Sequence, residues 1–410
     1  MKETGPRFET STTPVFFFTS KYRSGVHVVI APDKFKGTLS ASEVADALAR
    51  GVRAAIPHAS LTLRPIGDGG EGTLDALLLA HGGRVSSKRV SGPLGGLVEA
   101  PLAHLADGSC VMEMSDAAGL TLVDPDRRDA MASSTLGLGE LIAAAMDEGE
   151  RRILIGVGGS ASTDGGTGAA TAVGWRFLDA GGEGLRLGGG SLKHLARIDG
   201  SAVRPEVTAT DIVAACDVDN PLLGDSGAAR VFAPQKGASP EEAEVLEEGL
   251  ATLATRIRKD LGIDVAELRR SGAAGGTGAG LRAFFGAKLG PGFDVVAEAT
   301  HLRDEIDRAD LVLTGEGSLD DQSLGGKAPM GVARMALELG VPCYAVAGEV
   351  SAEPRALKRE GILETTSLIE AVGSERAFAD TAGAIVEATK TLIRQHLTEG
   401  SRRQRRAWPI

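Results

Sequence analysis

The chain has 410 residues, of which 42% are hydrophobic and 24% are charged, and its formal net charge is −11 at pH 7. This length predicts two or three domains with full-sized cores, and the acidic balance argues against a nucleic-acid partner. The three cysteines are widely spaced and form no C-x-x-C pair, which predicts a reduced, cytoplasmic protein without a disulfide framework.

The two ends of the chain differ in composition from the rest. Residues 1–24 contain the apolar cluster PVFFF, which is too short to span a membrane or to form a signal-peptide core. We expect a disordered extension there and no membrane contact. Residues 399–410 read as a solvated basic tail.

The first elements in chain order alternate between strand and helix. The β-branched run at 26–31 is a predicted strand, and Ser40 with Glu43 forms a capping-box pattern before a predicted helix. A second strand at 61–66 leads into the glycine-rich segment GDGGEGT and a helix that ends near residue 81. This is a start of the doubly wound type. Residues 84–114 then change to short alternating runs, which predict antiparallel hairpins.

The middle of the chain differs from its two ends in the pattern of its predicted helices and strands. Helices are predicted at 135–147 and 240–259 and strands at 152–157 and 212–216, and the βα rhythm returns after residue 310 and lasts to about residue 396. We therefore predict an α/β protein of two domains. A doubly wound Rossmann-like domain, made of residues 25–83 and 290–398, is split by an inserted glycine-rich α/β domain at 84–289.

Two glycine segments match a dinucleotide-binding pattern. GDGGEG fits G-x-G-x-x-G through Gly67, Gly69 and Gly72, and GVGGSA fits a looser form. The first lacks an acidic residue after the next strand. The second is followed by STDGGTG, which makes a poor helix start. An NAD(P)-dependent oxidoreductase stays open as an alternative.

Several loops after predicted strands combine charges with glycine. APDKFKG and TGEGSLDDQSLGGKAP carry lysines and carboxylates, and ACDVDN carries carboxylates with Asn220. Lysines and backbone N–H groups at the carboxyl edge of a parallel sheet can hold phosphate. Since no G-x-x-x-x-G-K-[ST] motif is present, a P-loop is excluded. Solvated loops and Asx turns are the simpler alternative for each segment.

Taken in order, the segments resemble the bacterial glycerate kinase family of the type that yields 2-phosphoglycerate. The similarity runs from APDKFKGTLSASE through GDGGEGT, MEMSDAAGL, IGVGGSASTDGGTGAA, CDVDNPLLG, FAPQKGA and GAAGGTGAG to TGEGSLDDQSLGGKAP and VAGE. The resemblance implies ATP as phosphoryl donor, Mg²⁺ as cofactor, glycerate as acceptor, and a site in the cleft between two α/β domains.

Phosphoryl transfer needs in-line positioning, cations on phosphate oxygens and an acceptor for the hydroxyl proton. We predict Asp68 as the base, Lys36 and Lys327 as the main phosphate-neutralising groups, and Glu316 and Asp217 as metal ligands, with Asp217 also among the catalytic residues. The predicted substrate and phosphate contacts are Asp33, Lys34, Gly69, Gly70, Glu71, Gly158, Gly159, Ser160, Asp164, Asn220, Lys236, Gly315, Gly317 and Asp320.

The predicted reaction is therefore phosphorylation of (R)-glycerate by ATP, most simply at the 2-hydroxyl. Phosphorylation of the 3-hydroxyl, or of a related small hydroxy acid, is one alternative. A non-catalytic sugar-acid binding protein is another, from a different class. The expected partners are small molecules alone, and the chain is expected to be a monomer or a homodimer.

Overall fold

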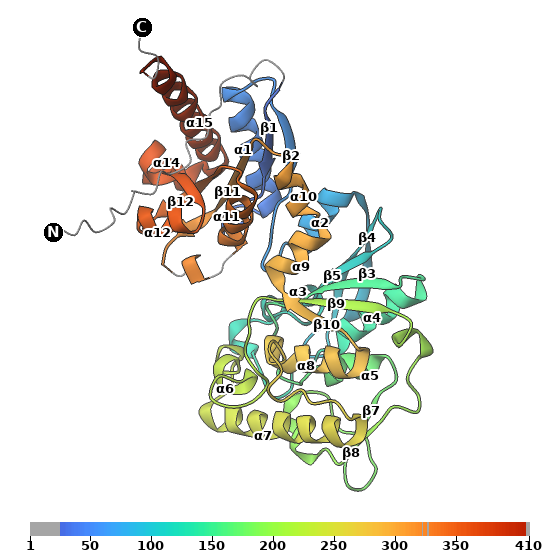
Figure 1. Cartoon of the computed structure of the whole chain (residues 1–410). Helices are drawn as coiled ribbons and strands as arrows, with labels where there is room; N and C mark the ends of the chain where they lie inside the picture. The colour runs from blue at the N-terminus through green and yellow to red at the C-terminus, as the bar shows by residue number, and fades with distance from the viewer. Residues whose placement is uncertain (1–24, 322, 326–327, 407–410) are drawn as a thin grey trace, which may run out of the picture.

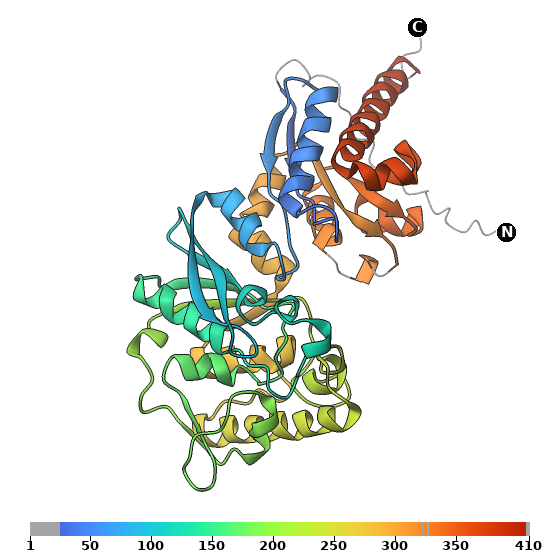
Figure 2. The ribbon, with the colours of Figure 1, turned by 180° about the vertical axis from the view of Figure 1, so that it is seen from behind.

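The protein, seen in a computed structural model, has two lobes built on two main sheets (Figures 1 and 2). The structure describes residues 25–321, 323–325 and 328–406. One lobe combines the beginning and the end of the described chain, and the other is formed by the middle. This arrangement confirms the α/β class and the insertion of one sheet between the strands of another.

The first sheet has five parallel strands in the order β13-β12-β11-β1-β2. Numbered within this sheet from the N-terminus, the strand order is 2-1-3-4-5. The strands are β1 (His27–Ile30), β2 (Ser60–Leu63), β11 (Leu311–Leu319), β12 (Cys343–Val350) and β13 (Ile362–Ser367).

Helices cover both faces of this parallel sheet. Along β1, Val28 and Ile30 pack with the helices α1 (Ala41–Ala55) and α15 (Thr381–Arg406), whereas Val29 packs on the opposite side with α11 (Ala328–Leu339). Because successive side chains of a strand point to opposite faces, a continuous apolar run is what a strand buried on both faces requires. The remaining helices of this lobe are α10 (Leu302–Asp307), α12 (Pro354–Arg359), α13 (Leu368–Val372) and α14 (Ser374–Ala379).

The second sheet is mixed and has six strands in the order β10-β9-β6-β5-β4-β3. The pairs β3–β4 and β4–β5 are antiparallel, which confirms the hairpins predicted for residues 84–114. The strands are β3 (Gly83–Ser91), β4 (Leu97–Leu105), β5 (Cys110–Glu113), β6 (Arg152–Gly156), β9 (Asp211–Cys216) and β10 (Lys288–Pro291).

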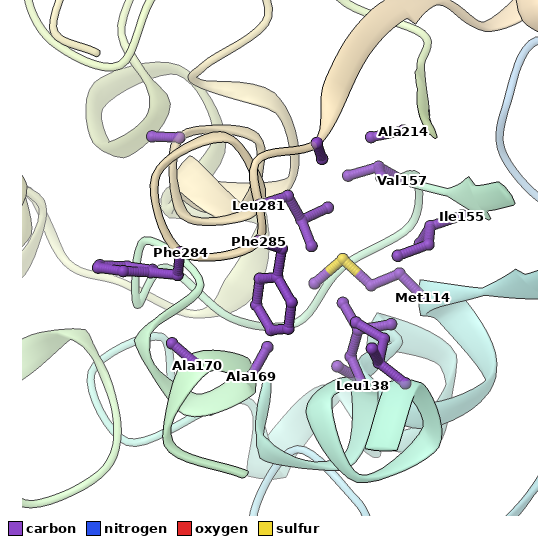
Figure 3. Close-up of a cluster of buried hydrophobic side chains, with 14 of the residues drawn as sticks. Met114, Leu138, Ile155, Val157, Ala169, Ala170, Ala214, Leu281, Phe284 and Phe285 are labelled. Carbon is purple, nitrogen blue, oxygen red and sulfur yellow. The ribbon is translucent and has the colours of Figure 1, made fainter. Parts of the chain in front are cut away.

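The core of the second lobe lies between this sheet and the helices on one of its faces. Figure 3 shows Met114, Leu138, Ile155, Leu281 and Phe285 pointing toward one another. Leu281 and Phe285 come from one helix, and the other three residues come from separate elements. The helices of this lobe, beside a small hairpin of β7 (Arg176–Leu178) and β8 (Arg197–Asp199), are α3 (Met114–Ala118), α4 (Leu136–Asp147), α5 (Thr167–Ala172), α6 (Ala228–Phe232), α7 (Pro240–Arg256) and α8 (Ala273–Phe285).

The predicted capping box of α1 is confirmed. Ser40 Oγ accepts a hydrogen bond from Glu43 N at 3.3 Å, and the Glu43 carboxylate accepts one from Ser40 N at 2.8 Å. These two bonds satisfy backbone donors that a helix start leaves without intrahelical partners. They fix the point at which the loop after β1 becomes α1.

Three predicted elements differ in extent or placement. The helix α2 (Thr73–His81) packs against the mixed sheet through Leu74 and Leu77, although it follows a strand of the parallel sheet. The strand β11 continues to Leu319, because β12 pairs with it as far as Val350. The helix α15 runs ten residues beyond its predicted end, into the segment predicted as a tail. The division of the chain after residue 83 stays a prediction.

No helix within the described ranges is both long enough and apolar enough to cross a bilayer.

Candidate functional site

The parallel sheet has its topological switch point between β1 and β11. The chain leaves β1 toward β2 on one side of the sheet, and leaves β11 toward β12 on the other. In open α/β sheets of this strand order, ligands bind outside the carboxyl ends of the two strands at that point. Asp33 follows β1 there, and its backbone N–H donates a hydrogen bond to the carbonyl oxygen of Gly315 in β11 at 2.8 Å.

Four predicted carboxylates interact at this point. Burial raises the pKa of Asp33 to about 7, with further increases from the negative charges of Asp68 and Glu316. Asp217 follows β9, at the edge of the other sheet. Its side chain is exposed at the mouth of a cleft, yet loss of solvation and the charge of Asp68 raise its pKa to about 6. The charge of Asp68 thus acts on carboxylates that follow strands of both sheets.

One of the three predicted lysines considered next, Lys34, lies beside these carboxylates. Lys34 Nζ donates a hydrogen bond to the carbonyl oxygen of Glu71 at 2.7 Å, and its positive charge lowers the pKa of both Asp33 and Asp217 against the stronger effects that raise them. Lys36 is exposed. Lys327, predicted as a catalytic residue, lies outside the described residues.

A first cleft, which we call the lysine cleft, lies between the loop 34–41 and the start of α2. Its volume is about 450 Å³, and Lys34, Lys36, Glu71, Glu113 and Asp116 are among its lining residues. Glu113 is buried and accepts hydrogen bonds from the N–H groups of Gly72 at 3.0 Å and Leu74 at 2.8 Å.

Sequence reasoning did not assign a role to Glu113 or Asp116, although both lie in the quoted segment MEMSDAAGL. Burial, followed by the charge of Asp116, raises the pKa of Glu113 to about 7 against the hydrogen bonds that it accepts. Burial, followed by the charge of Glu71, raises the pKa of Asp116 to about 6. Glu113 serves as the cap of α2, and Asp116 adds a second acidic group to the lysine cleft.

A second cleft, which we call the arginine cleft, lies between β9 and α11. Its volume is about 550 Å³, and Asp68 and Asp217 line it together with Arg269, Arg270, Arg303 and Arg334. None of the four arginines was predicted. Two of them immediately precede the glycine segment GAAGGTGAG, but the others come from α10 and α11, and no local pattern in the sequence connects them.

Asp219 holds the arginines at the entrance of this cleft. Its carboxylate pairs with Arg269 at 2.6 Å and with Arg270 at 2.7 Å. Arg270 has a φ of +69°, a conformation that side chains other than glycine seldom adopt. The loop 67–72 contributes to both clefts, because Glu71 and Gly72 line the lysine cleft and Asp68 lines the arginine cleft.

The loop 67–72 is clamped by close backbone contacts. Gly69 has a φ of +87°, and a Cβ atom there would lie 2.7 Å from the carbonyl oxygen of Ala215 in β9. A Cβ atom on Gly292, at the start of α9 (Gly292–Ala299), would lie 1.5 Å from the carbonyl oxygen of Asp68. Asp68 Oδ1 also accepts a hydrogen bond from Gly70 N at 3.1 Å. Backbone contacts with β9 and with the start of α9 therefore set the place of Asp68.

Asp164 and Lys236, predicted as substrate or phosphate contacts, are both buried. The Asp164 carboxylate accepts hydrogen bonds from Ser134 Oγ, from Thr135 N and Oγ1, and from the N–H groups of Gly166 and Gly168. Through these bonds, the Asp164 carboxylate connects the start of α4 with the start of α5. A direct substrate contact for Asp164 stays a prediction that this geometry does not favour.

The other predicted contacts lie in three segments. Gly158, Gly159 and Ser160 form a turn after β6. Gly315 and Gly317 lie inside β11, so the segment predicted as an open phosphate cradle is part of the sheet. Asn220 Nδ2 donates to the carbonyl oxygen of Ser226 at 2.7 Å, and Asp320 Oδ1 accepts from Ser323 N at 2.9 Å. Both of these hydrogen bonds stabilise a local turn.

The carboxylates of Asp33 and Asp217 fit a magnesium ion that is also bound by substrate phosphate. Among the residues that the structure describes, no three carboxylate, histidine or cysteine side chains form a ready-made metal cage. Mg²⁺ characteristically uses one or two carboxylates and completes its shell with water and substrate phosphates. Asp33 and Asp217 have raised pKa values in a cluster of like charge, and a bound cation would relieve that repulsion.

The dinucleotide-binding alternative fails on topology. After GDGGEG, α2 leads into β3, which pairs antiparallel with β4 in the other sheet. No parallel βαβ unit is therefore closed around the loop, and that unit is what the fingerprint requires. The second match is followed by α5, which has only six residues.

Comparison with known proteins gives a consistent result. The model of the Glycerate kinase family matches residues 28–397. The chain is 45% identical over 348 residues to a glycerate kinase of Halalkalibacterium halodurans, with 85% of this chain and 92% of that protein covered. It is 41% identical over 367 residues to the glycerate 2-kinase of Escherichia coli, with 89% and 96% covered.

A solved structure has the same fold. A crystal structure of a Salmonella typhimurium protein assigned as glycerate kinase 2 superimposes with a TM-score of 0.83 at 41% sequence identity. The match covers 92% of this chain and all of that one, so it includes both lobes.

Proposed function

The chain belongs to the glycerate kinase family and is a phosphotransferase, and from this premise we propose that it phosphorylates (R)-glycerate at the 2-hydroxyl with ATP. The terminal phosphoryl group of ATP passes to the glycerate oxygen, the hydroxyl proton passes to a base, and ADP and 2-phosphoglycerate are released. The choice of the 2-hydroxyl is supported by the relative named glycerate 2-kinase.

One observation carries this proposal: Asp68 and Asp217 line the same cleft, and the charge of Asp68 acts on both Asp217 and Asp33, which are also within the influence of the Lys34 ammonium group. A carboxylate held in a fixed place beside a substrate cleft can accept the hydroxyl proton in the transition state. We therefore assign the base role to Asp68.

Anionic substrates need local positive charge in a protein whose net charge is −11. We assign this role to Lys34 and Lys36, which line the lysine cleft, and, as predicted from the sequence, to Lys327. The turn 158–160 is assigned to supply backbone N–H groups to phosphate. These roles are consistent with phosphoryl transfer, in which positioning and charge neutralisation supply most of the catalysis.

Asp33, Asp217 and Glu316 are the residues that would hold Mg²⁺. When bound, the ion neutralises the phosphate oxygens and the developing charge during transfer. The protein contributes carboxylates from both lobes, so that the metal and phosphate would lie where the lobes meet.

Release of ADP from MgATP, measured with a panel of acceptors, tests this proposal. We expect release with (R)-glycerate, and far less with (S)-glycerate, lactate or glycerol. Equal rates with all four acceptors, or no rate above the ATP background, would contradict the assignment. Binding of NADH without ADP release would revive the oxidoreductase alternative.

A further inference from the structure

Lys236 is an ammonium group enclosed within the protein. It ends a short turn, Pro234–Lys236, and is 2% exposed. Nζ donates hydrogen bonds to Ser160 Oγ at 2.8 Å and to the carbonyl oxygen of Ser162 at 2.5 Å. Lys236 is absent from the lining of both described clefts. This environment does not suit a direct phosphate contact.

The partners of Lys236 belong to the turn that follows β6. The turn is also bonded to the segment 118–120: the carbonyl oxygen of Gly159 accepts a hydrogen bond from Leu120 N at 2.7 Å, and Ala161 N donates to the carbonyl oxygen of Ala118 at 2.9 Å. The turn is therefore held both by Lys236 and by this segment. Burial also lowers the pKa of Lys236 to about 7, and the nearby charge of Asp164 opposes this shift.

The turn in question lies directly against the loop that carries Asp68. A Cβ atom on Gly158 would lie 2.8 Å from Gly70 Cα, so the two backbones are in contact without side chains between them. Gly70 N in turn donates to Asp68 Oδ1 at 3.1 Å. A short series of contacts thus leads from Lys236 through Ser160 and Gly158 to the Asp68 carboxylate.

We propose that Lys236 is a positioning residue for phosphoryl transfer. It fixes the position of the turn 158–160 and, through the contact between Gly158 and Gly70, the position of the Asp68 carboxylate. This inference rests on the proposed function. It replaces the predicted role of Lys236 as a charge that touches phosphate. Displacing a reacting group by about 1 Å can reduce a rate by about 10²-fold even when the substituted residue lies away from the reacting atoms.

The test compares Lys236→Met and Ser160→Ala with the control Lys193→Met, which alters an exposed lysine of the same lobe. For Lys236→Met we expect kcat to fall by about 10- to 100-fold, with the KM values for ATP and glycerate changed less than about threefold. Ser160→Ala removes one of the two bonds and should reduce kcat by several-fold. Lys193→Met should match the unaltered protein.

The decisive comparison repeats these substitutions together with Asp68→Asn. If Lys236 acts through Asp68, replacing Lys236 should lower kcat only slightly in the Asp68→Asn variant. The effects of the two substitutions on kcat are then far from additive. Equal fold-losses with and without Asp68, or a lower Tm with unchanged kcat, would overturn the proposal. A raised KM for ATP at unchanged kcat would also do so, because it would restore a direct phosphate contact.

The experiment also distinguishes a variant that does not fold, a failure of the proposed function and a failure of the positioning role alone. If Lys236→Met does not fold, Ser160→Ala with and without Asp68→Asn gives the same comparison. If the unaltered protein releases no ADP with glycerate, the proposed function fails. If the protein is active and Lys236→Met is equally active, only the positioning role fails.

Discussion

Asp68 is the residue on which the account of catalysis depends most. Replacing it by Asn keeps the shape of the side chain and the acceptor for Gly70 N, but removes the base. We expect Asp68→Asn to lower kcat by about 10²–10⁴-fold, the usual contribution of a positioned base. Steady-state ADP release measures this effect. The control is Asp225→Asn, whose side chain is fully exposed, and a loss of only a few-fold for Asp68→Asn would remove the base assignment.

The charged carboxylate of Asp33 is expected to serve the function of the protein while it lowers the stability of the folded state. Its pKa of about 7 lies above the ordinary value of 3.8, so between about pH 4 and pH 7 the folded protein binds more protons at this site than the unfolded chain. Stability contributed by Asp33 is therefore lost as the pH rises through this window. Asp33→Asn removes the unfavourable charge and should raise the Tm by a few degrees at pH 8.

The same substitution should have little effect on the Tm at pH 5, where Asp33 is already mostly protonated. Activity should fall at both pH values, because a proposed metal ligand is lost. Thermal unfolding at pH 5 and pH 8, without nucleotide, checks the prediction. A lower Tm for Asp33→Asn at pH 8 would show that the charged carboxylate stabilises the fold.

At the level of elements, the start of α9 is predicted to hold the Asp68 loop in place. Gly292→Ala would put a methyl group 1.5 Å from the carbonyl oxygen of Asp68, so either the loop or the helix must move. We expect kcat to fall at least tenfold, with a reduced Tm as well. Gly184→Ala is the matched control, because a Cβ atom there meets nothing within 4 Å. Similar behaviour of the two variants would contradict the clamp.

Most elements of this fold could be predicted from local patterns. The run at 26–31 became β1, Ser40 and Glu43 marked the start of α1, and the helix predicted at 135–147 agrees with α4 within one residue. These features depend on the strand period of two, on capping chemistry and on helical spacing, all of which act over a few residues. The strand end at Leu319 could not be predicted, because pairing with β12 decides it.

The candidate site was predictable only where its residues follow strands. Asp33, Lys34, Asp68 and Asp217 were identified because loops at the carboxyl ends of strands meet at one edge of the fold. The burial of Lys236 was missed, since a charged residue in a glycine-containing segment is more often exposed. The arginine cleft was missed because its four arginines come from three separate segments that only the folded chain brings together.

At the scale of the whole molecule, the chain crosses between the lobes beside the candidate site. One crossing is the loop 67–72, and the other leads from β10 into α9. Arg64, just before the first crossing, pairs with Glu305 at 2.9 Å and donates to the carbonyl oxygen of Thr300 at 3.2 Å. Both crossings are therefore tied to the parallel-sheet lobe, while Asp217 and the turn 158–160 come from the other. The proposed site therefore needs residues of both lobes.

The central claim is that this two-lobed site transfers phosphate to the 2-hydroxyl of glycerate. The most direct measurement adds enolase, without a phosphoglycerate mutase, to a reaction of the protein with MgATP and (R)-glycerate, and records phosphoenolpyruvate. Our account predicts that phosphoenolpyruvate forms at the rate of ADP release, because enolase acts on 2-phosphoglycerate alone. ADP release without phosphoenolpyruvate would contradict the claim and indicate transfer to the 3-hydroxyl.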